Sequence, residues 1–318
     1  MRLISALLAC GLAMLSLTQS MHAQQGTSSS EGVMAGLSKS PGAQRVLIDT
    51  PAAPNVPVWY LRPPGISSAA PVVFVMHGVG RDADRYLAEW APLAVQHGFV
   101  VVVPEFTKEA FPGADAYNLG ATQGADGRLK PKEAWSYAVI ESAFDAVRAR
   151  EKLVAPSYLL YGHSAGAQFV HRFVMLGAGR RMKLAVAANA GWYAFPDAQI
   201  DWPYGLRRAP GEPAVAAVLS ATLTVLIGDA DTDPNSSSLR HTPEADAQGR
   251  HRFERGQAYY RAAQKTSASI GAPLAWSCAI APGLGHENGV AARFAVGLLL
   301  GTTRVQPGAP CSAIRPTW

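Results

Sequence analysis

Apolar residues in this chain fall into two patterns, short continuous runs and longer amphipathic segments. The run at 99–103 is a phenylalanine followed by four valines, which is typical of a parallel strand covered on both faces. Residues 131–151 carry apolar side chains three and four positions apart, which predicts a helix with one buried face. Runs and amphipathic segments alternate from residue 71 onward. This alternation predicts an α/β fold, a doubly wound and mostly parallel sheet with helices on both faces.

The same two patterns place the other elements. Two short strands come first, and Pro54 and Pro57 suggest that they lie at the edge of the sheet. Long loops are expected where periodicity is lost, at 105–130, 191–221 and 232–252. The other strands and helices are expected at 44–48, 56–61, 71–76, 158–161, 184–190, 222–227 and 273–280 for strands, and at 82–96, 165–176, 253–270 and 288–300 for helices.

A motif for a nucleophile lies between the strand at 158–161 and the helix that follows it. The residues Gly162-His163-Ser164-Ala165-Gly166 have the Gly-x-Ser-x-Gly spacing of a nucleophile elbow. The two glycines lack a Cβ, so the strand and the helix can approach the tight turn closely. The turn exposes the serine hydroxyl and aims the next backbone N–H at a bound carbonyl oxygen. The sequence therefore makes Ser164 the candidate nucleophile.

Three further motifs follow strand ends. They are His77-Gly78-Val79-Gly80 after an early strand, Gly228-x-x-Asp231 after a late strand, and His286 after the last strand. Together with the elbow they resemble the α/β-hydrolases, in which serine, acid and histidine occur in this order. The resemblance spans about residues 44–305, and within that superfamily the chain is similar to secreted serine esterases and polyester-depolymerase-like hydrolases.

The resemblance implies a role for each of these residues. Ser164 is the nucleophile, and His286 is the general base that takes its proton and returns it to the leaving group. Asp231 orients the imidazole and stabilises its charged form. The backbone N–H groups of Val79 and Ala165 are expected to form the oxyanion hole. Neither a metal nor an organic cofactor is expected.

The acid has competitors, because Asp229, Asp231 and Asp233 alternate just after the strand. The family spacing Gly-x-x-Asp selects Asp231, and Asp229 and Asp233 are the alternatives. Together with Asn235, these residues also have the spacing of a metal-binding loop. The glycine and the distal glutamate of a calcium-binding hand are missing from it.

Aromatic and basic residues in or near the long loops are candidates for substrate contacts. Trp192 and Tyr193 follow a strand at the catalytic edge of the sheet, and each either walls an acyl or alcohol pocket or packs in the core. A basic cluster near the acid is either the rim of a site for an anionic substrate or a solvated face. Its members are Arg240, His241, Arg250, His251, Arg252 and Arg255.

Composition narrows the class of protein. The chain has 318 residues, of which 48% are hydrophobic and 16% charged, so it can bury a sizeable core and is not a disordered chain. Its net charge of +5 is mild, and no run of Lys/Arg or nucleic-acid-binding motif accompanies it. We therefore expect no nucleic-acid partner, and we expect one catalytic domain over residues 44–305.

The N-terminus has the pattern of a secretory signal peptide. Arg2 precedes an apolar segment at 3–17, and cleavage is expected after Ala23. Residues 7–10 also faintly resemble a lipoprotein cleavage site. Residues 24–43 are rich in Gln, Gly and Ser and are expected to form a disordered leader. We expect a secreted or periplasmic protein without stable membrane insertion.

The cysteines agree with export to an oxidising compartment. Cys10 lies in the signal segment, which leaves Cys278 and Cys311 as a pair. A disulfide between them would tie the C-terminal tail, residues 306–318, to the last strand.

The sequence thus predicts an exported serine hydrolase that cleaves small or polymeric carboxylic esters through an acyl-enzyme. One alternative with the same triad is a hydrolase of amide or peptide bonds in an acidic polymer. Another is an acyltransferase, and a third is a binding protein on an inactive hydrolase fold. The sequence does not predict the oligomeric state.

Overall fold

The computed structural model describes residues 40–317. The predicted signal peptide, residues 1–23, and all but the end of the predicted leader lie outside the described residues. Among those described, no helix has both the length and the hydropathy needed to cross a membrane.

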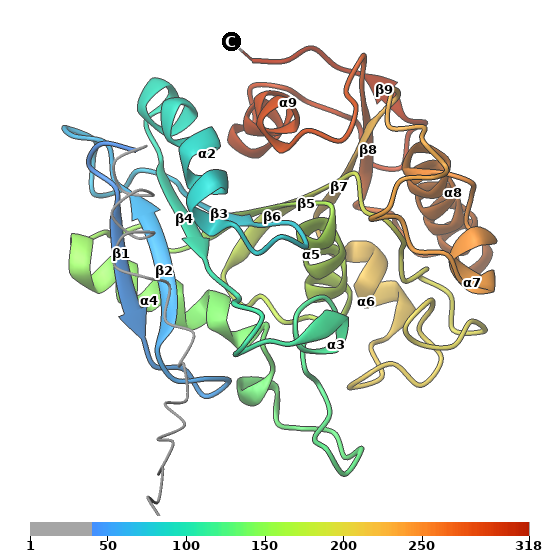
Figure 1. Cartoon of the computed structure of the whole chain (residues 1–318). Helices are drawn as coiled ribbons and strands as arrows, with labels where there is room; N and C mark the ends of the chain where they lie inside the picture. The colour runs from blue at the N-terminus through green and yellow to red at the C-terminus, as the bar shows by residue number, and fades with distance from the viewer. Residues whose placement is uncertain (1–39, 318) are drawn as a thin grey trace, which may run out of the picture.

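The described residues form one nine-stranded sheet with helices on both faces (Figure 1). The spatial order of the strands is β1-β2-β4-β3-β5-β6-β7-β8-β9. Every neighbouring pair from β4 to β9 in this order is parallel. β2 pairs antiparallel with both of its neighbours, β1 and β4. The strands are β1 Gln44–Ile48, β2 Val56–Leu61, β3 Val72–Met76, β4 Val100–Pro104, β5 Tyr158–His163, β6 Met182–Ala188, β7 Leu223–Gly228, β8 Ser277–Ala281 and β9 Ser312–Ala313. The doubly wound α/β fold expected from the sequence is confirmed.

The edge position predicted for the first two strands is wrong for β2. β1 forms the edge of the sheet, and β2 pairs with β1 on one side and with β4 on the other. Pro57 is tolerated there because the pairing of β2 with β4 begins one residue later, at Val58 and Pro104.

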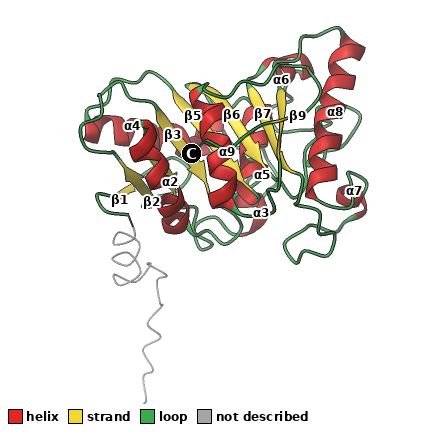
Figure 2. Cartoon of the chain, turned by 90° about the horizontal axis from the view of Figure 1, so that it is seen from above, coloured by secondary structure: helices red, strands yellow, loops and turns green. Residues whose placement is uncertain are grey.

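The helices cover the two faces in separate groups (Figures 1 and 2). Helices α2 and α9 pack on one face and share a core with it, and α4, α5, α6 and α8 pack on the other. The helices are α2 Ala83–His97, α3 Gly113–Ala116, η1 Lys132–Ala134, α4 Ala138–Glu151, α5 Ala165–Met175, α6 Val215–Ser220, α7 Pro243–Asp246, α8 Arg252–Ile270 and α9 Asn288–Leu300.

The helix predicted over 131–151 begins later than expected. A short 3₁₀ helix, η1, ends at Ala134, and the backbone of the next residue, Trp135, is extended with ψ at 147°. The indole N–H of Trp135 donates to the carbonyl of Lys130, which fixes this break, and α4 starts only at Ala138. The apolar spacing of the sequence does not register such a local side-chain contact.

Strand β3 shows why the buried strands read as continuous apolar runs. Successive side chains of a strand point to opposite faces of the sheet. Phe74 and Met76 contribute to the core under α4 and α5, and Val73 and Val75 contribute to the core under α2 and α9. Because both faces are covered, every residue of β3 is buried.

Cys278 on β8 and Cys311, next to β9, form a disulfide, as the cysteine count predicted. The bond joins the C-terminal tail to the sheet across a separation of 33 residues. Ser312–Ala313 then pairs with Ala279 and Ile280, so the tail becomes the last strand.

Reduction of this disulfide is expected to lower the free energy of unfolding by about 3–4 kcal/mol, because it releases a loop constraint on the unfolded chain. Urea unfolding with and without reductant measures the difference. The double variant Cys278→Ala/Cys311→Ala serves as the control and is expected not to respond to reductant. Equal stability of the oxidised and reduced wild type would contradict the prediction.

Candidate active site

The turn between β5 and α5 holds Ser164 in a backbone conformation that few residues adopt. Its φ is 58° and its ψ is −116°. A Cβ on Gly162 would lie 2.2 Å from the carbonyl oxygen of Gly166, and a Cβ on Gly166 would lie 2.1 Å from that of Met76. Both positions therefore require glycine, and the close packing they permit holds the strained serine in place.

Three side chains form a continuous hydrogen-bonded relay. His286 Nε2 lies 3.0 Å from Ser164 Oγ, and His286 Nδ1 lies 2.7 Å from Asp231 Oδ2. Asp231 is buried, with 4% of its surface exposed, and His286 is half-buried. The structure thus brings together the serine, histidine and aspartate that the sequence placed after three different strands. This is the arrangement of a nucleophile, a general base and an orienting acid.

The neighbouring aspartates have other partners. Asp229 Oδ1 accepts a hydrogen bond of 2.7 Å from the backbone N–H of Gly283, which fastens the loop that carries His286. Asp233 is exposed and accepts from the N–H of Asn235. Within residues 40–317, no group of three or more His, Cys, Asp or Glu side chains is arranged to hold a metal ion.

Two residues support the relay, and the sequence assigned neither of them to it; Arg252 was expected only as a member of the basic cluster. Arg252 is 1% exposed, and its Nη1 lies 3.5 Å from Asp231 Oδ1. Asn189 donates 2.7 Å to the carbonyl of Gly285 and accepts 2.8 Å from the N–H of Gly228. It therefore ties the loop of the histidine to the end of the strand that precedes the acid. Its φ is positive, at 49°, a conformation that asparagine adopts more readily than most residues.

The two residues whose backbone N–H groups are expected to form an oxyanion hole both line a cavity that Ser164 also lines. Ala165 is the first residue of α5, so its N–H has no acceptor inside the helix. Val79 is 62% exposed and lines both cavities at Ser164. Its loop is held by His77, whose Nε2 accepts 3.0 Å from the N–H of Phe106 and whose carbonyl accepts 2.7 Å from the hydroxyl of Tyr117.

Burial favours the neutral form of His77 and His163, the two buried histidines beside the relay. It lowers the pKa of His77 from 6.5 to about 4 and that of His163 well below its usual value. The ring of His163 lies 4.6 Å from the ring of His286, between centroids. A neutral His163 adds no second positive charge when His286 takes up a proton.

The buried His77 makes stability depend on pH. Its folded-state pKa lies below its unfolded value, so its contribution is complete above pH 6.5 and is lost as the pH falls toward about 4. The expected loss in unfolding free energy is roughly 3 kcal/mol over that window. In His77→Gln, whose side-chain oxygen can still accept from Phe106, the curve is expected to flatten by this amount. Urea titrations at several pH values measure it, and an unchanged slope would contradict the assignment.

Two cavities meet at Ser164. One, of about 770 Å³, runs between α2 and α9 and includes His286; we name it the α2–α9 cavity. The other, of about 570 Å³, is bordered by α3 and by the loop after the acid and includes Ala165; we name it the α3 cavity. Val79, Ser164 and Ser238 line both. A substrate attacked at Ser164 therefore has room on two sides.

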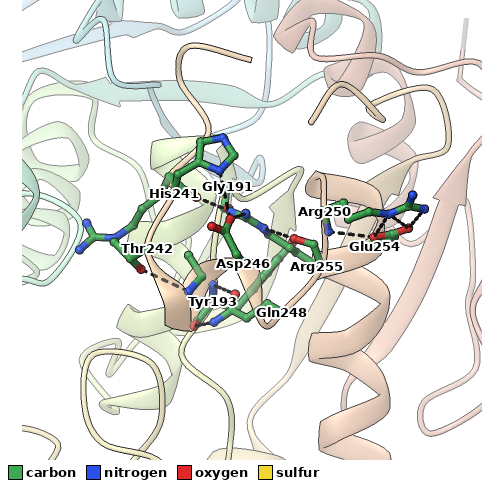
Figure 3. Close-up of polar contacts among 12 residues, drawn as sticks. Gly191, Tyr193, His241, Thr242, Asp246, Gln248, Arg250, Glu254 and Arg255 are labelled. Atoms are coloured by element: carbon green, nitrogen blue, oxygen red, sulfur yellow. Dashed lines mark hydrogen bonds and ion pairs between the residues drawn. The ribbon is translucent and has the colours of Figure 1, made fainter. Parts of the chain in front are cut away.

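The structure separates the two aromatic candidates. Trp192 lines the α3 cavity. Tyr193 lines neither cavity: it is fully buried, and its ring stacks on Tyr259 with a centroid distance of 4.4 Å. Gln248 holds its backbone in place by bonding to both its N–H and its carbonyl (Figure 3). Tyr193 is thus a core residue, and the prediction that it walls a pocket is corrected.

The basic cluster is divided in the same way. Arg252 and Arg255 are fully buried, and Arg255 donates to the carbonyls of Gly191 and Arg240 and to Asp246. Figure 3 shows Arg255 between Gly191 and Asp246, and Arg250 farther off, paired with Glu254. Arg240 alone among the six lines the α3 cavity. His241 is exposed and pairs with Asp246. His251 is the N-cap of α8.

Two solved structures are similar to this chain in both fold and sequence. The chain is similar to poly(aspartic acid) hydrolase-1 from Sphingomonas sp. KT-1, with 42% identity, a TM-score of 0.79, and coverage of 82% of this chain and 99% of that one. It is also similar to LpqC, a poly(3-hydroxybutyrate) depolymerase from Bordetella parapertussis, with 33% identity, a TM-score of 0.75, and coverage of 83% and 90%. An S-formylglutathione hydrolase from Agrobacterium tumefaciens shares the fold at 15% identity and a TM-score of 0.52. No protein-family model and no curated protein sequence matches the chain.

Proposed function

The chain belongs to the α/β-hydrolase family, among the hydrolases that resemble polyester depolymerases, and on this premise we propose that it cleaves carboxylic esters with Ser164 as nucleophile. The observation that carries the proposal is the relay from Ser164 Oγ through His286 to Asp231, with distances of 3.0 and 2.7 Å.

The geometry sets the order of events. His286 Nε2 takes the hydroxyl proton as Ser164 Oγ attacks the carbonyl carbon, and the charge that develops on the carbonyl oxygen is held by the N–H groups of Ala165 and Val79. The imidazolium then gives its proton to the leaving alkoxide, and an acyl-enzyme remains. Water, deprotonated by His286, releases the acid and regenerates the serine. Asp231 keeps Nε2 directed at the reacting atoms and stabilises the imidazolium.

We place this reaction outside the cytoplasm. The disulfide between Cys278 and Cys311 supports an oxidising compartment, and the signal-like N-terminus supplies the route. N-terminal sequencing of exported protein tests this, with a new terminus after Ala23 expected.

Aryl esters of graded acyl length, from acetyl to dodecanoyl, test the activity. We expect serine-dependent turnover with an initial burst of phenol, and the preferred length measures how far the acyl group reaches into its cavity. Absence of turnover with every ester, despite labelling of Ser164 by a fluorophosphonate, would overturn the ester assignment.

A second candidate is hydrolysis of amide bonds in an acidic polymer. Two observations favour it: the cationic residues Arg81, Lys108 and Arg240 line the α3 cavity, and a relative with 42% identity is a poly(aspartic acid) hydrolase. The same acyl group offered as an ester and as an anilide separates the candidates. A preference for the anilide after correction for intrinsic reactivity would favour the amide.

A further inference from the structure

The two cavities at Ser164 differ in charge. Of the described residues that line the α3 cavity, three are cationic and none is acidic. The α2–α9 cavity is lined by both signs, with Asp82, Glu89 and Glu287 beside Arg85 and Arg293. Arg85 is already neutralised there, because it pairs with Asp82 at 2.5 Å and with Glu89 at 2.6 Å. An anionic group is therefore favoured on one side of the nucleophile only.

The chemistry tells which side is which. The leaving group must receive its proton from His286, so it departs on the side of that imidazole. His286 lines the α2–α9 cavity and not the α3 cavity. Ala165, whose N–H holds the carbonyl oxygen in the proposed reaction, lines the α3 cavity and not the other. The leaving group thus occupies the α2–α9 cavity, and the acyl chain extends into the α3 cavity.

Arg240 is prepared to receive an anion. Its guanidinium lies over the Trp192 ring, 4.7 Å from the centroid, and its Nε donates 2.8 Å to the hydroxyl of Tyr204. Its carbonyl accepts 2.9 Å from Arg255, so the backbone is fixed as well. No acceptor in the described part of the chain takes up its two Nη groups. A stacked, anchored guanidinium with a free edge matches the two oxygens of a carboxylate.

The other two cations play lesser parts. Arg81 is buried, and its Nη groups are already committed to the carbonyls of Phe106 and Gly113, so it adds positive potential without a free donor. Lys108 also lines the α3 cavity, but it is exposed, so its ammonium stays in contact with solvent. Arg240 is therefore the side chain best placed to decide specificity.

We propose that the enzyme prefers acyl groups that carry a carboxylate and that Arg240 is the specificity-determining residue that binds this carboxylate in the α3 cavity. The inference rests on the proposed function, since it assigns acyl and leaving-group sides by that reaction. The leaving-group side carries no matching preference for an anion.

Two pairs of isosteric esters test the sidedness. Ethyl hydrogen succinate and ethyl 4-methylpentanoate differ in charge on the acyl side, and carboxymethyl butanoate and isobutyl butanoate differ in charge on the alcohol side. The readout is the ratio of kcat/KM for the charged over the neutral ester within each pair. In Arg240→Gln the acyl-side ratio is expected to fall about tenfold or more, as for loss of a hydrogen bond between charged groups. The alcohol-side ratio is expected to change less than about twofold, because solvent screens the interaction between Arg240 and a charge in the other cavity.

Arg250→Gln is the matched control, because Arg250 belongs to the same loop but pairs with Glu254 and lines neither cavity. Both of its ratios are expected to equal those of the wild type. An unchanged acyl-side ratio in Arg240→Gln, or a loss confined to the alcohol-side pair, would overturn the proposal.

A binding measurement separates this proposal from the ester activity itself. Succinate is expected to slow fluorophosphonate labelling of Ser164 in the wild type and to do so at least about tenfold less effectively in Arg240→Gln. Protection that depends on Arg240, without turnover of any ester, would refute the ester activity and support the carboxylate site. Turnover of neutral esters without protection by succinate would refute the carboxylate site and leave the ester activity standing.

Discussion

Ser164→Ala is expected to lower kcat for ester hydrolysis about 10⁵-fold or more, because the nucleophile and the general base act as one unit. The protein is expected to stay folded. The backbone N–H of Ser164 donates to the carbonyl of Ala188, and this bond does not involve the lost hydroxyl. Activity is measured on the preferred aryl ester, and folding by circular dichroism and urea unfolding.

The matched control for this variant is Ser269→Ala, at the exposed end of α8 opposite the end that carries Arg252 beside Asp231. Its kcat is expected to equal that of the wild type. Hydrolysis by Ser164→Ala at more than about a hundredth of the wild-type rate would show that another group is the nucleophile, since a lost nucleophile costs far more.

Asp231→Asn is expected to lower kcat about 10³–10⁴-fold, because the neutral amide neither stabilises the imidazolium nor holds the productive tautomer of His286. Asp233→Asn is expected to leave kcat within about twofold, since Asp233 is an exposed loop residue and such changes have small effects. Asp229→Asn is expected to fall between them, because Asp229 positions the loop of His286 through Gly283.

Rates of the three variants under saturating substrate decide among the aspartates. A larger loss of activity in Asp229→Asn or Asp233→Asn than in Asp231→Asn would show that Asp231 is not the acid of the triad. The Oδ2–Nδ1 distance of 2.7 Å at Asp231 is the structural ground for the expected order.

The parts of the site that could be predicted from the sequence are those fixed by strand ends. Ser164, Asp231 and His286 each follow a buried strand, and parallel strands bring their carboxyl ends to one edge of the sheet. Gly162 and Gly166 must be glycine, because a Cβ at either position would clash with a backbone carbonyl oxygen. Short sequence motifs were sufficient here because each motif determines the backbone turn at the end of its strand.

The residues in and beside the long loops were harder to assign, because the contacts that bury or expose them come from other parts of the chain. Trp192 and Tyr193 are adjacent and chemically alike, yet one lines a cavity and the other stacks on Tyr259. Arg252 and Arg255 look like surface cations in the sequence. Their burial depends on partners that lie elsewhere in the chain, such as Asp231 and the carbonyl of Gly191. Tertiary contacts of this kind leave no local signal.

The proposed function requires Ser164 to be an activated nucleophile. Treatment with a fluorophosphonate, followed by intact-mass and peptide mass spectrometry, measures this most directly. We expect a single adduct on the peptide that contains Ser164, no adduct in Ser164→Ala, and markedly slower labelling in His286→Gln. An adduct on another residue, or an unlabelled Ser164 in a folded protein that still hydrolyses esters, would contradict it.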